Sequence, residues 1–286
     1  VGAVADLPTA PAAWAYLGHE FCERLLPTAA RVRQASQRAT AAGHGFALVT
    51  PSLRERGLDR LQRLLETLAA TAPGSEVVVN DWGVLRLVAA HGGALVPVVG
   101  RLMNKMLRDP RVTPNLAETA TPEALRASRD CALTASGFAR LLRSYGVSVV
   151  ELDNVAQGLG VDFAAVGLRP ALHLPFACVA SGPACAIAGI GRPRRTKFTA
   201  TTLCHRECQR VQTTMTDPHA PVGADGQLGR GNSVFHRQNP AQLRAGLRWA
   251  AAHGARVVVH SDAFGPAARA TCDVAVASTW LAVADA

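Results

Sequence analysis

Seven short apolar runs, separated for the most part by amphipathic stretches, constrain the fold of this chain more than any other feature. Several of these runs are apolar throughout rather than alternating, which is typical of parallel strands that are covered on both faces. A repeated order of strand and helix predicts a parallel α/β architecture. We expect the strands at residues 14–17, 45–50, 76–80, 95–99, 147–152, 171–174 and 256–260.

The number of strands favours one barrel over two domains. Seven strands in 286 residues, with no clear linker, predict a TIM-barrel-like (β/α)8-type parallel barrel, complete or incomplete, in a single domain over residues 1–286. A leucine stripe that begins at Leu58 predicts one helix, and residues 122–144 are expected to hold another. The stretch 178–237 is rich in Gly, Pro, Thr and Arg, and predicts an irregular, cysteine-bearing excursion.

Composition narrows the class of protein. Apolar residues make up 49% of the chain, but no apolar run reaches the roughly 18 residues of a membrane helix. Seven cysteines are an odd number, which argues against a disulfide scaffold and favours a reducing compartment. With no leader pattern at the start, we expect a cytoplasmic protein. The net charge of +9, carried almost entirely by arginine, favours an anionic substrate or partner.

Four cysteines are spaced as a metal site would need them. Cys204 and Cys208 lie one helical turn apart, Cys185 precedes them across a loop rich in glycine and arginine, and Cys22 follows the first predicted strand. Four thiolates gathered from distant segments form a site for a soft metal, either an iron–sulfur cluster or zinc. Ordinary buried cysteines would show the same spacing, so these residues alone leave the choice open.

Polar residues follow several predicted strands directly. Asp81 and Glu151 are candidates for acid–base groups, because the carboxyl ends of barrel strands carry the chemistry in this architecture. Helix capping is the alternative, since Asp and Asn are favoured at helix N-termini. His173 and His260 also follow or end apolar runs, and for them we expect packing roles in the core.

Several blocks, taken together and in order, resemble a known family. The chain resembles the collagenase-like peptidase superfamily and, within it, the UbiU/UbiV-like iron–sulfur proteins of the ubiquinone pathway, the UbiV type most closely. No Ser/His/Asp arrangement and no zinc-protease motif is evident, so we do not expect peptidase activity. The blocks that carry the resemblance are residues 16–22, 79–85, 100–105, 108–111, 151–154, 173–176 and 231–235.

The resemblance implies a cofactor and a reaction. Matched position by position, it implies a [4Fe–4S] cluster held by four cysteines, with zinc as the alternative metal, and it leaves Cys178 as a core residue. It implies oxygen-independent hydroxylation of an aromatic ring, with prephenate as the oxygen donor. Arg194 and Arg195, on the loop between two of the implied ligands, are the expected contacts for the carboxylated donor. The implied ligands are Cys22, Cys185, Cys204 and Cys208.

Partners and alternatives follow from the same resemblance. The relatives act in pairs, so we expect a homologous partner subunit in a heterodimer, and the chain is then either the hydroxylase or one subunit of it. The second hypothesis is an RNA nucleobase hydroxylase of the same superfamily. The positive net charge favours it, whereas the lack of a basic patch with interleaved aromatic residues in the sequence disfavours it. A non-enzymatic redox or assembly protein that binds a cluster is the third.

Overall fold

Seven parallel strands form the main sheet of the protein. A computed structural model describes residues 14–110, 119–199, 203–215 and 227–260. Every pairing in the main sheet is parallel, and each strand lies within two residues of the run that predicted it. In spatial order the strands are β1 (Trp14–Gly18), β2 (Gly45–Val49), β3 (Ser75–Val79), β4 (Leu95–Val99), β5 (Val149–Asp153), β6 (Arg169–Leu174) and β11 (Arg256–Val259).

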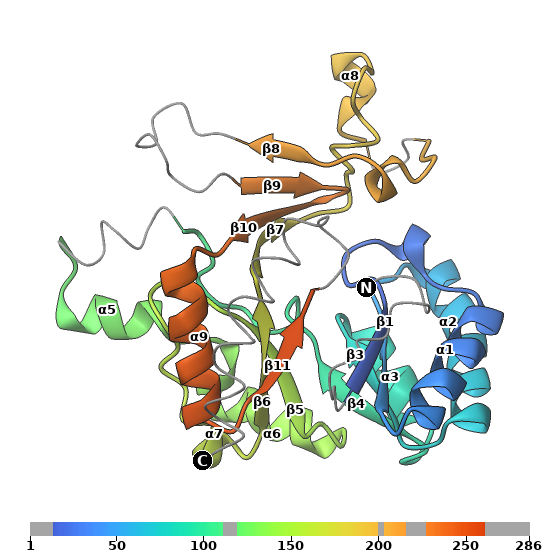
Figure 1. Cartoon of the computed structure of the whole chain (residues 1–286), viewed down its shortest axis with the longest axis horizontal. Coiled ribbons are helices and arrows are strands. Elements are labelled where there is room, and N and C mark those ends of the chain that lie inside the picture. Colours follow the sequence, from blue (N-terminus) through green and yellow to red (C-terminus); the bar gives the residue numbers. More distant parts are fainter. Residues whose placement is uncertain (1–13, 111–118, 200–202, 216–226, 261–286) are drawn as a thin grey trace.

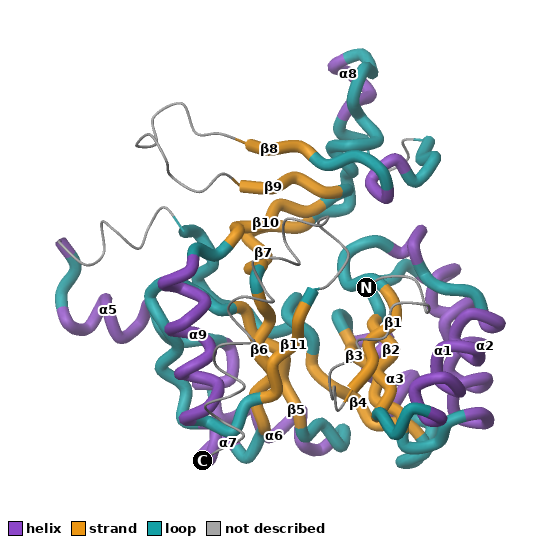
Figure 2. The backbone as a smooth tube through the Cα atoms, viewed as in Figure 1, coloured by secondary structure: helices purple, strands orange, loops and turns teal. Residues whose placement is uncertain are grey.

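The main sheet curls into a half-barrel with helices on its outer side (Figures 1 and 2). The prediction of an α/β protein with a curled parallel sheet is therefore confirmed, and the half-barrel is consistent with an incomplete barrel. Strands β1 and β11 are the edges of the sheet in the described residues. No helix in these residues is both long enough and apolar enough to cross a bilayer. The larger outer helices are α1 (Ala29–Ala41), α2 (Glu55–Thr71), α3 (Trp82–Ala89), α6 (Ser136–Ser144) and α9 (Pro240–Ala252).

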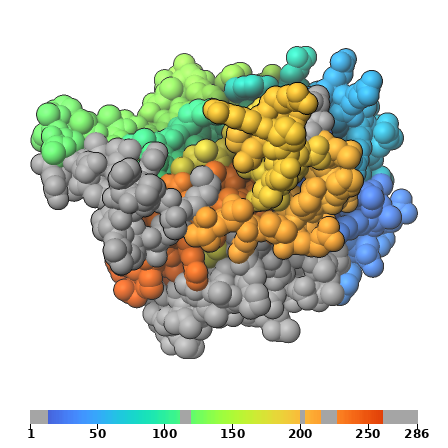
Figure 3. All heavy atoms as spheres, turned by 90° about the horizontal axis from the view of Figure 1, so that it is seen from above, coloured from blue at the N-terminus to red at the C-terminus, as the bar shows by residue number. Residues whose placement is uncertain are grey.

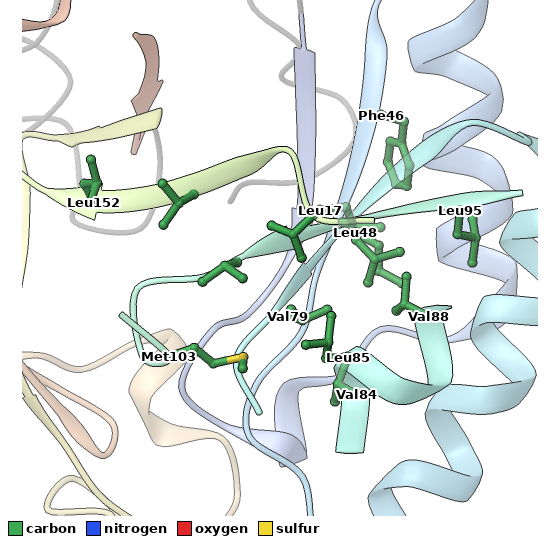
Figure 4. Close-up of a cluster of buried hydrophobic side chains, with 14 of the residues drawn as sticks. Leu17, Phe46, Leu48, Val79, Val84, Leu85, Val88, Leu95, Met103 and Leu152 are labelled. Carbon is green, nitrogen blue, oxygen red and sulfur yellow. The ribbon is translucent and has the colours of Figure 1, made fainter. Parts of the chain in front are cut away.

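Alternate residues of each strand face the helices or the inside of the half-barrel. On the helix side, Leu17, Leu48 and Val79 pack with Leu85 of α3 in the large core (Figure 4). On the inside, the seven strands contribute one residue each to a second apolar layer. Because both faces of the sheet are buried, the strands are continuous apolar runs in the sequence. The inner layer consists of Tyr16, Val49, Val78, Val98, Val149, Ala171 and Val258.

The two edge strands are joined by Arg256 at the start of β11. Its guanidinium donates to the Tyr16 hydroxyl on β1 (2.8 Å) and to Glu76 Oε1 on β3 (2.9 Å). It also lies 4.2 Å from the centroid of the Trp14 ring. These contacts cross the inside of the curled sheet near the amino ends of the strands, so this end of the half-barrel is filled by side chains.

One predicted helix is broken in the structure. The leucine stripe from Leu58 belongs to α2, as predicted, and its buried members pack in the large core. Residues 122–144 instead form α5 (Pro122–Ser128), a 3-10 turn (Ala132–Thr134) and α6. The break occurs because Cys131 is extended and pairs with Met106 in an isolated β-bridge. A single helix over this range was a wrong prediction.

A second, antiparallel sheet stands above the carboxyl ends of the parallel strands. Strand β7 (Phe176–Ser181) follows β6 after a single residue and pairs with β10 (Ser233–Arg237). Strands β9 (Gln227–Arg230) and β8 (Thr213–Met215) complete the order β7-β10-β9-β8. Seen from that side, the excursion lies in front of the barrel (Figure 3). The expectation of an irregular excursion over 178–237 therefore holds only for the loops between these strands.

Candidate functional site

Buried polar side chains converge inside the half-barrel near the carboxyl ends of the strands. Glu151 on β5 and His173 on β6 face inward from neighbouring strands, and Glu20 reaches them from the loop after β1. All three are buried, and one ligand atom from each lies within 4.8 Å of the others. His260 lies directly after β11 and contacts His173. We call these four residues the barrel site.

The barrel site holds two neutral imidazoles and one carboxyl group with a raised pKa. His173 Nδ1 lies 2.8 Å from His260 Nε2, and His173 Nε2 lies 3.0 Å from Glu151 Oε2. Burial lowers the pKa of His173 to about 3 and that of His260 well below its usual range. Burial also raises the pKa of Glu151 to about 8, although the positive charge of Arg101 opposes this shift.

Arg101 is the centre of a buried ionic network beside the barrel site. Its side chain is fully buried, and its guanidinium donates to both carboxylate oxygens of Glu20 and to Asp153 Oδ1 at 2.7 Å. Arg108 Nε donates to the other Asp153 oxygen at 2.6 Å. The two arginines hold the pKa of Asp153 below its usual range despite its burial. Two positive and two negative charges thus balance one another.

The strand-end sequence Asn80-Asp81 explains how Arg101 is positioned. Asn80 Nδ2 donates to Thr50 O at 2.8 Å, and Asn80 Oδ1 accepts from the amide of Leu102 at 3.1 Å. This amide side chain fixes the turn after β4, from which Arg101 enters the interior. Gly100 is required here, because a Cβ at that position would collide with the Asn80 side chain.

Asp81, a predicted acid–base residue, has a structural role. Its Oδ1 accepts from the amide of Val84 at 2.8 Å and caps α3, while its Oδ2 accepts from the amide of Leu53 at 2.7 Å. Both contacts match the alternative of helix capping. The structure does not bring Asp81 into the barrel site, and we leave it out of the chemistry proposed below.

The four predicted cysteine ligands gather between the loop after β1 and the excursion. The pKa of Cys208 is raised to about 11, first by burial and then by the neighbouring thiols of Cys185, Cys22 and Cys204. The pKa of Cys22 is likewise raised by burial and then by Cys204 and Cys185. Cys22 and Cys208 therefore each lie close enough to Cys185 and Cys204 to interact with them electrostatically. We call these four cysteines the thiol site.

Asn232 holds the distant segments of the thiol site together. Its Nδ2 donates to the carbonyl oxygens of Phe21 and Gly182, both at 2.6 Å, and so connects the neighbourhoods of the first and second cysteines. Gly231, with φ +63°, packs directly against Cys208. Two thiols also accept hydrogen bonds from backbone amides, each with an N–S distance of 3.3 Å: Cys185 from Ala188 and Cys204 from Arg206.

The route by which Cys204 and Cys208 come together differs from the expected helical turn. Residues 203–206 are not helical, and only Glu207–Gln209 form a 3-10 turn. Arg206 has φ 60°, in the left-handed region that is uncommon for a residue with a side chain. This conformation directs the Arg206 amide at Cys204. The helical premise was therefore wrong, although the thiols are still neighbours.

The two other cysteines in the described part of the chain lie apart from the thiol site. Cys178 is buried against Phe176 and Phe235, and burial together with Asp153 raises its pKa to about 12. Cys131 is buried in the large core. Both placements agree with an ordinary packing role, and Cys272 lies outside the described residues.

The two arginines expected to bind a carboxylated donor are exposed. Arg194 and Arg195 belong to the short helix α8 (Arg194–Lys197), which stands at the far end of the excursion from the main sheet (Figure 1). The structure does not bring them to the barrel site. Any anion that they bind would meet the protein at its outer surface.

Sequence reasoning missed most of the barrel site. It assigned His173 and His260 to packing, and it did not single out Glu20 or Arg101. One signal could have found it, because side chains two positions apart on a strand face the same side. Glu151 follows the inner-layer residue Val149 by two positions, and His173 follows Ala171 by two, so both would be expected to face the inside of the barrel.

Comparison with known proteins identifies no family for this chain. No family model matches it, and no curated protein matches it either.

Proposed function

We propose that this protein is an iron–sulfur protein that takes part in the oxygen-independent hydroxylation of an aromatic ring, as the enzyme or as one subunit of it. The observation that carries the proposal is that the thiols of Cys22 and of three cysteines in the excursion lie close enough to interact electrostatically. The family resemblance in the sequence supplies the reaction, the carboxylated donor (prephenate), the homologous partner subunit and the TIM type of the barrel.

The thiol site has the donor chemistry that a [4Fe–4S] cluster needs. Four thiolates from separate segments are the usual ligands of such clusters, and hydrogen bonds to sulfur tune their potentials. The backbone amides of Ala188 and Arg206 already donate to two of the thiols. When bound, the cluster would supply electron transfer.

The barrel site would move protons for such a reaction. Glu20 stands two residues before Cys22, so one short segment enters both sites. Glu151, with a pKa of about 8, keeps its proton at neutral pH and is a proton donor inside the barrel. His173 and His260 are neutral at the same pH and form a hydrogen-bonded pair that can relay a proton by exchanging tautomers, without either ring becoming positively charged.

The cluster proposal predicts metal content and which cysteines matter. Anaerobically reconstituted protein should hold about four irons and four sulfides per chain, measured by elemental analysis and by ultraviolet–visible and EPR spectra. Ala at any residue of the thiol site should remove or destabilise the cluster. Cys178→Ala and Cys131→Ala are the matched controls and should keep it. Stoichiometric zinc without iron would contradict the proposal, as would loss of iron in Cys178→Ala but not in Cys185→Ala.

One observation favours the RNA-modifying alternative, namely the exposed basic helix α8 with Arg194, Arg195 and Lys197. RNA binding would neutralise several phosphates and weaken steeply with salt, whereas a small anion needs only local contacts. Because Arg194 and Arg195 lie at the outer surface and not at the barrel site, we expect Arg194→Ala/Arg195→Ala to leave the KM for the carboxylated donor unchanged, with weak RNA binding throughout. Tight RNA binding at physiological salt that this double variant loses would instead support the nucleobase hydroxylase.

A further inference from the structure

We propose that Glu20, Glu151 and His173 bind one divalent transition-metal ion inside the half-barrel, at a site separate from the four cysteines. The residues come from the loop after β1 and from strands β5 and β6, and all three are buried. One oxygen or nitrogen atom of each lies within 4.8 Å of the other two. This proposal does not depend on the thiol site. A bound ion would replace the proton of Glu151, so the metal site is an alternative to the proton-donor role given to Glu151 above.

The distances suit a small metal ion. Two ligands at right angles, each about 2.1 Å from an ion, lie about 3 Å apart. His173 Nε2 and Glu151 Oε2 lie 3.0 Å apart. Glu20 completes a group of three atoms within 4.8 Å, and small side-chain rotations would bring its oxygen to the same ion.

The atoms that face this position lack hydrogen-bond partners. Within the described part of the chain, neither Glu151 oxygen nor His173 Nε2 makes a hydrogen bond of acceptable geometry, although the two side chains are buried. The Tyr16 hydroxyl is close enough to Glu151 to lower its pKa, but its alignment falls short of a regular hydrogen bond. Their 3.0 Å contact is close but lacks the alignment of a hydrogen bond. A buried polar atom without a partner is costly. A bound cation would give all three atoms a partner at once.

His260 holds His173 in the tautomer that a metal requires. A neutral imidazole has one N–H and one lone pair. If His173 Nδ1 donates to His260 Nε2, at 2.8 Å, the lone pair of His173 lies on Nε2, which faces Glu151. Metal-binding histidines usually donate their other ring N–H to a neighbouring group in this way.

The surrounding charges leave room for the cation. Arg101 and Arg108 already balance Glu20 and Asp153 through direct ion pairs. Glu151 is the carboxyl group that this network does not neutralise, and it has no ion pair with an arginine among the described residues. A carboxylate has about four lone-pair positions, so the two contacts of Glu20 with Arg101 leave positions for an ion.

The donor set indicates the class of metal. Two carboxylates with one imidazole suit Mn²⁺, Fe²⁺ or Zn²⁺, whereas thiolate sites select softer metals. Mn²⁺ therefore discriminates between the barrel site and the thiol site. It is also visible by EPR.

The test is an EPR titration of chelator-treated full-length protein with Mn²⁺. We expect one bound Mn²⁺ per chain in the wild type and in Cys204→Ala. Glu151→Gln and His173→Gln should weaken binding at least tenfold, and His260→Gln about 10–100-fold, as for other partners of metal-binding histidines. Glu76→Gln is the matched control, since it changes a buried carboxyl group at the opposite end of the barrel, and it should bind Mn²⁺ like the wild type.

Several outcomes would overturn the metal site. If the wild-type protein bound neither Mn²⁺ nor Zn²⁺ stoichiometrically, the proposal would be contradicted without any variant. Binding that survives in both Glu151→Gln and His173→Gln, or that is lost only in Cys204→Ala, would place the metal elsewhere. Acid-labile sulfide content, measured on the same samples after reconstitution, reports on the thiol site alone, because the barrel site binds no sulfide. Failure of either proposal is therefore distinguishable from failure of the other.

Discussion

Arg101→Met should destabilise the protein by about 3–5 kcal/mol, because it leaves buried charges without their partner. Arg101 is fully buried and supports the carboxylates of both Glu20 and Asp153. A typical domain has only about 5–15 kcal/mol of stability. The variant should therefore unfold at much lower urea concentration than the wild type, followed by circular dichroism.

The control for Arg101 is an ion pair at the surface. Arg54 pairs with Glu23 and is mostly exposed, and exposed ion pairs contribute little to stability. Arg54→Met should therefore leave the urea midpoint almost unchanged. If Arg101→Met were as stable as Arg54→Met, the buried network would not have the structural role described here.

The second large effect is a loss of stability with rising pH, caused by Glu151. In metal-free protein its pKa is raised to about 8 by burial, while a carboxyl group in the unfolded chain has a pKa near 4.3. The folded state thus keeps a proton that the unfolded state has released, and the stability gained from this proton is lost as pH rises through about 8. Between pH 6.5 and pH 8 the loss should be about 2 kcal/mol.

The isosteric variant Glu151→Gln isolates this effect. It keeps the shape of the side chain but cannot ionise, so its stability should not fall in the same way over this window. Burial lowers the pKa of His173 and His260 in the fold, whereas the usual pKa of histidine is about 6.5. These histidines therefore add stability as pH rises at the lower end of this window. Both proteins share this contribution, so it cancels in the difference between wild type and Glu151→Gln. Equal slopes of unfolding free energy against pH for the two proteins, measured after chelation, would show that Glu151 is ionised in the fold.

The parallel strands could be predicted because burial on both faces leaves a direct trace in the sequence. A strand such as Val149–Asp153 is apolar where it packs and becomes polar only where it reaches the inside of the barrel. The antiparallel sheet left no such trace. One of its pairings joins β7 with β10 across a long stretch of loops, and an edge strand such as Thr213–Met215 is too short to show a pattern.

The two sites differ in how far the sequence could reveal them. The thiol site depends on an uncommon residue type, so Cys22 and Cys208 could be connected by chemistry alone. The barrel site depends on three-dimensional pairing, since Arg101 meets Glu20 81 positions away and Asp153 52 positions away. An arginine that will be buried looks in the sequence like one that will be exposed, until its partners are placed.

The contacts of Arg256 have a consequence for the order of events during synthesis of the chain. Arg256 meets Glu76 and Tyr16 across 180 and 240 positions, respectively. Domains fold as they leave the ribosome, and contacts between distant positions form late. Strands β1 to β6 must therefore emerge and assemble before the guanidinium of Arg256 can pair with Glu76. Nascent chains that stop before residue 256 should therefore be the ones that chaperones and proteases recognise.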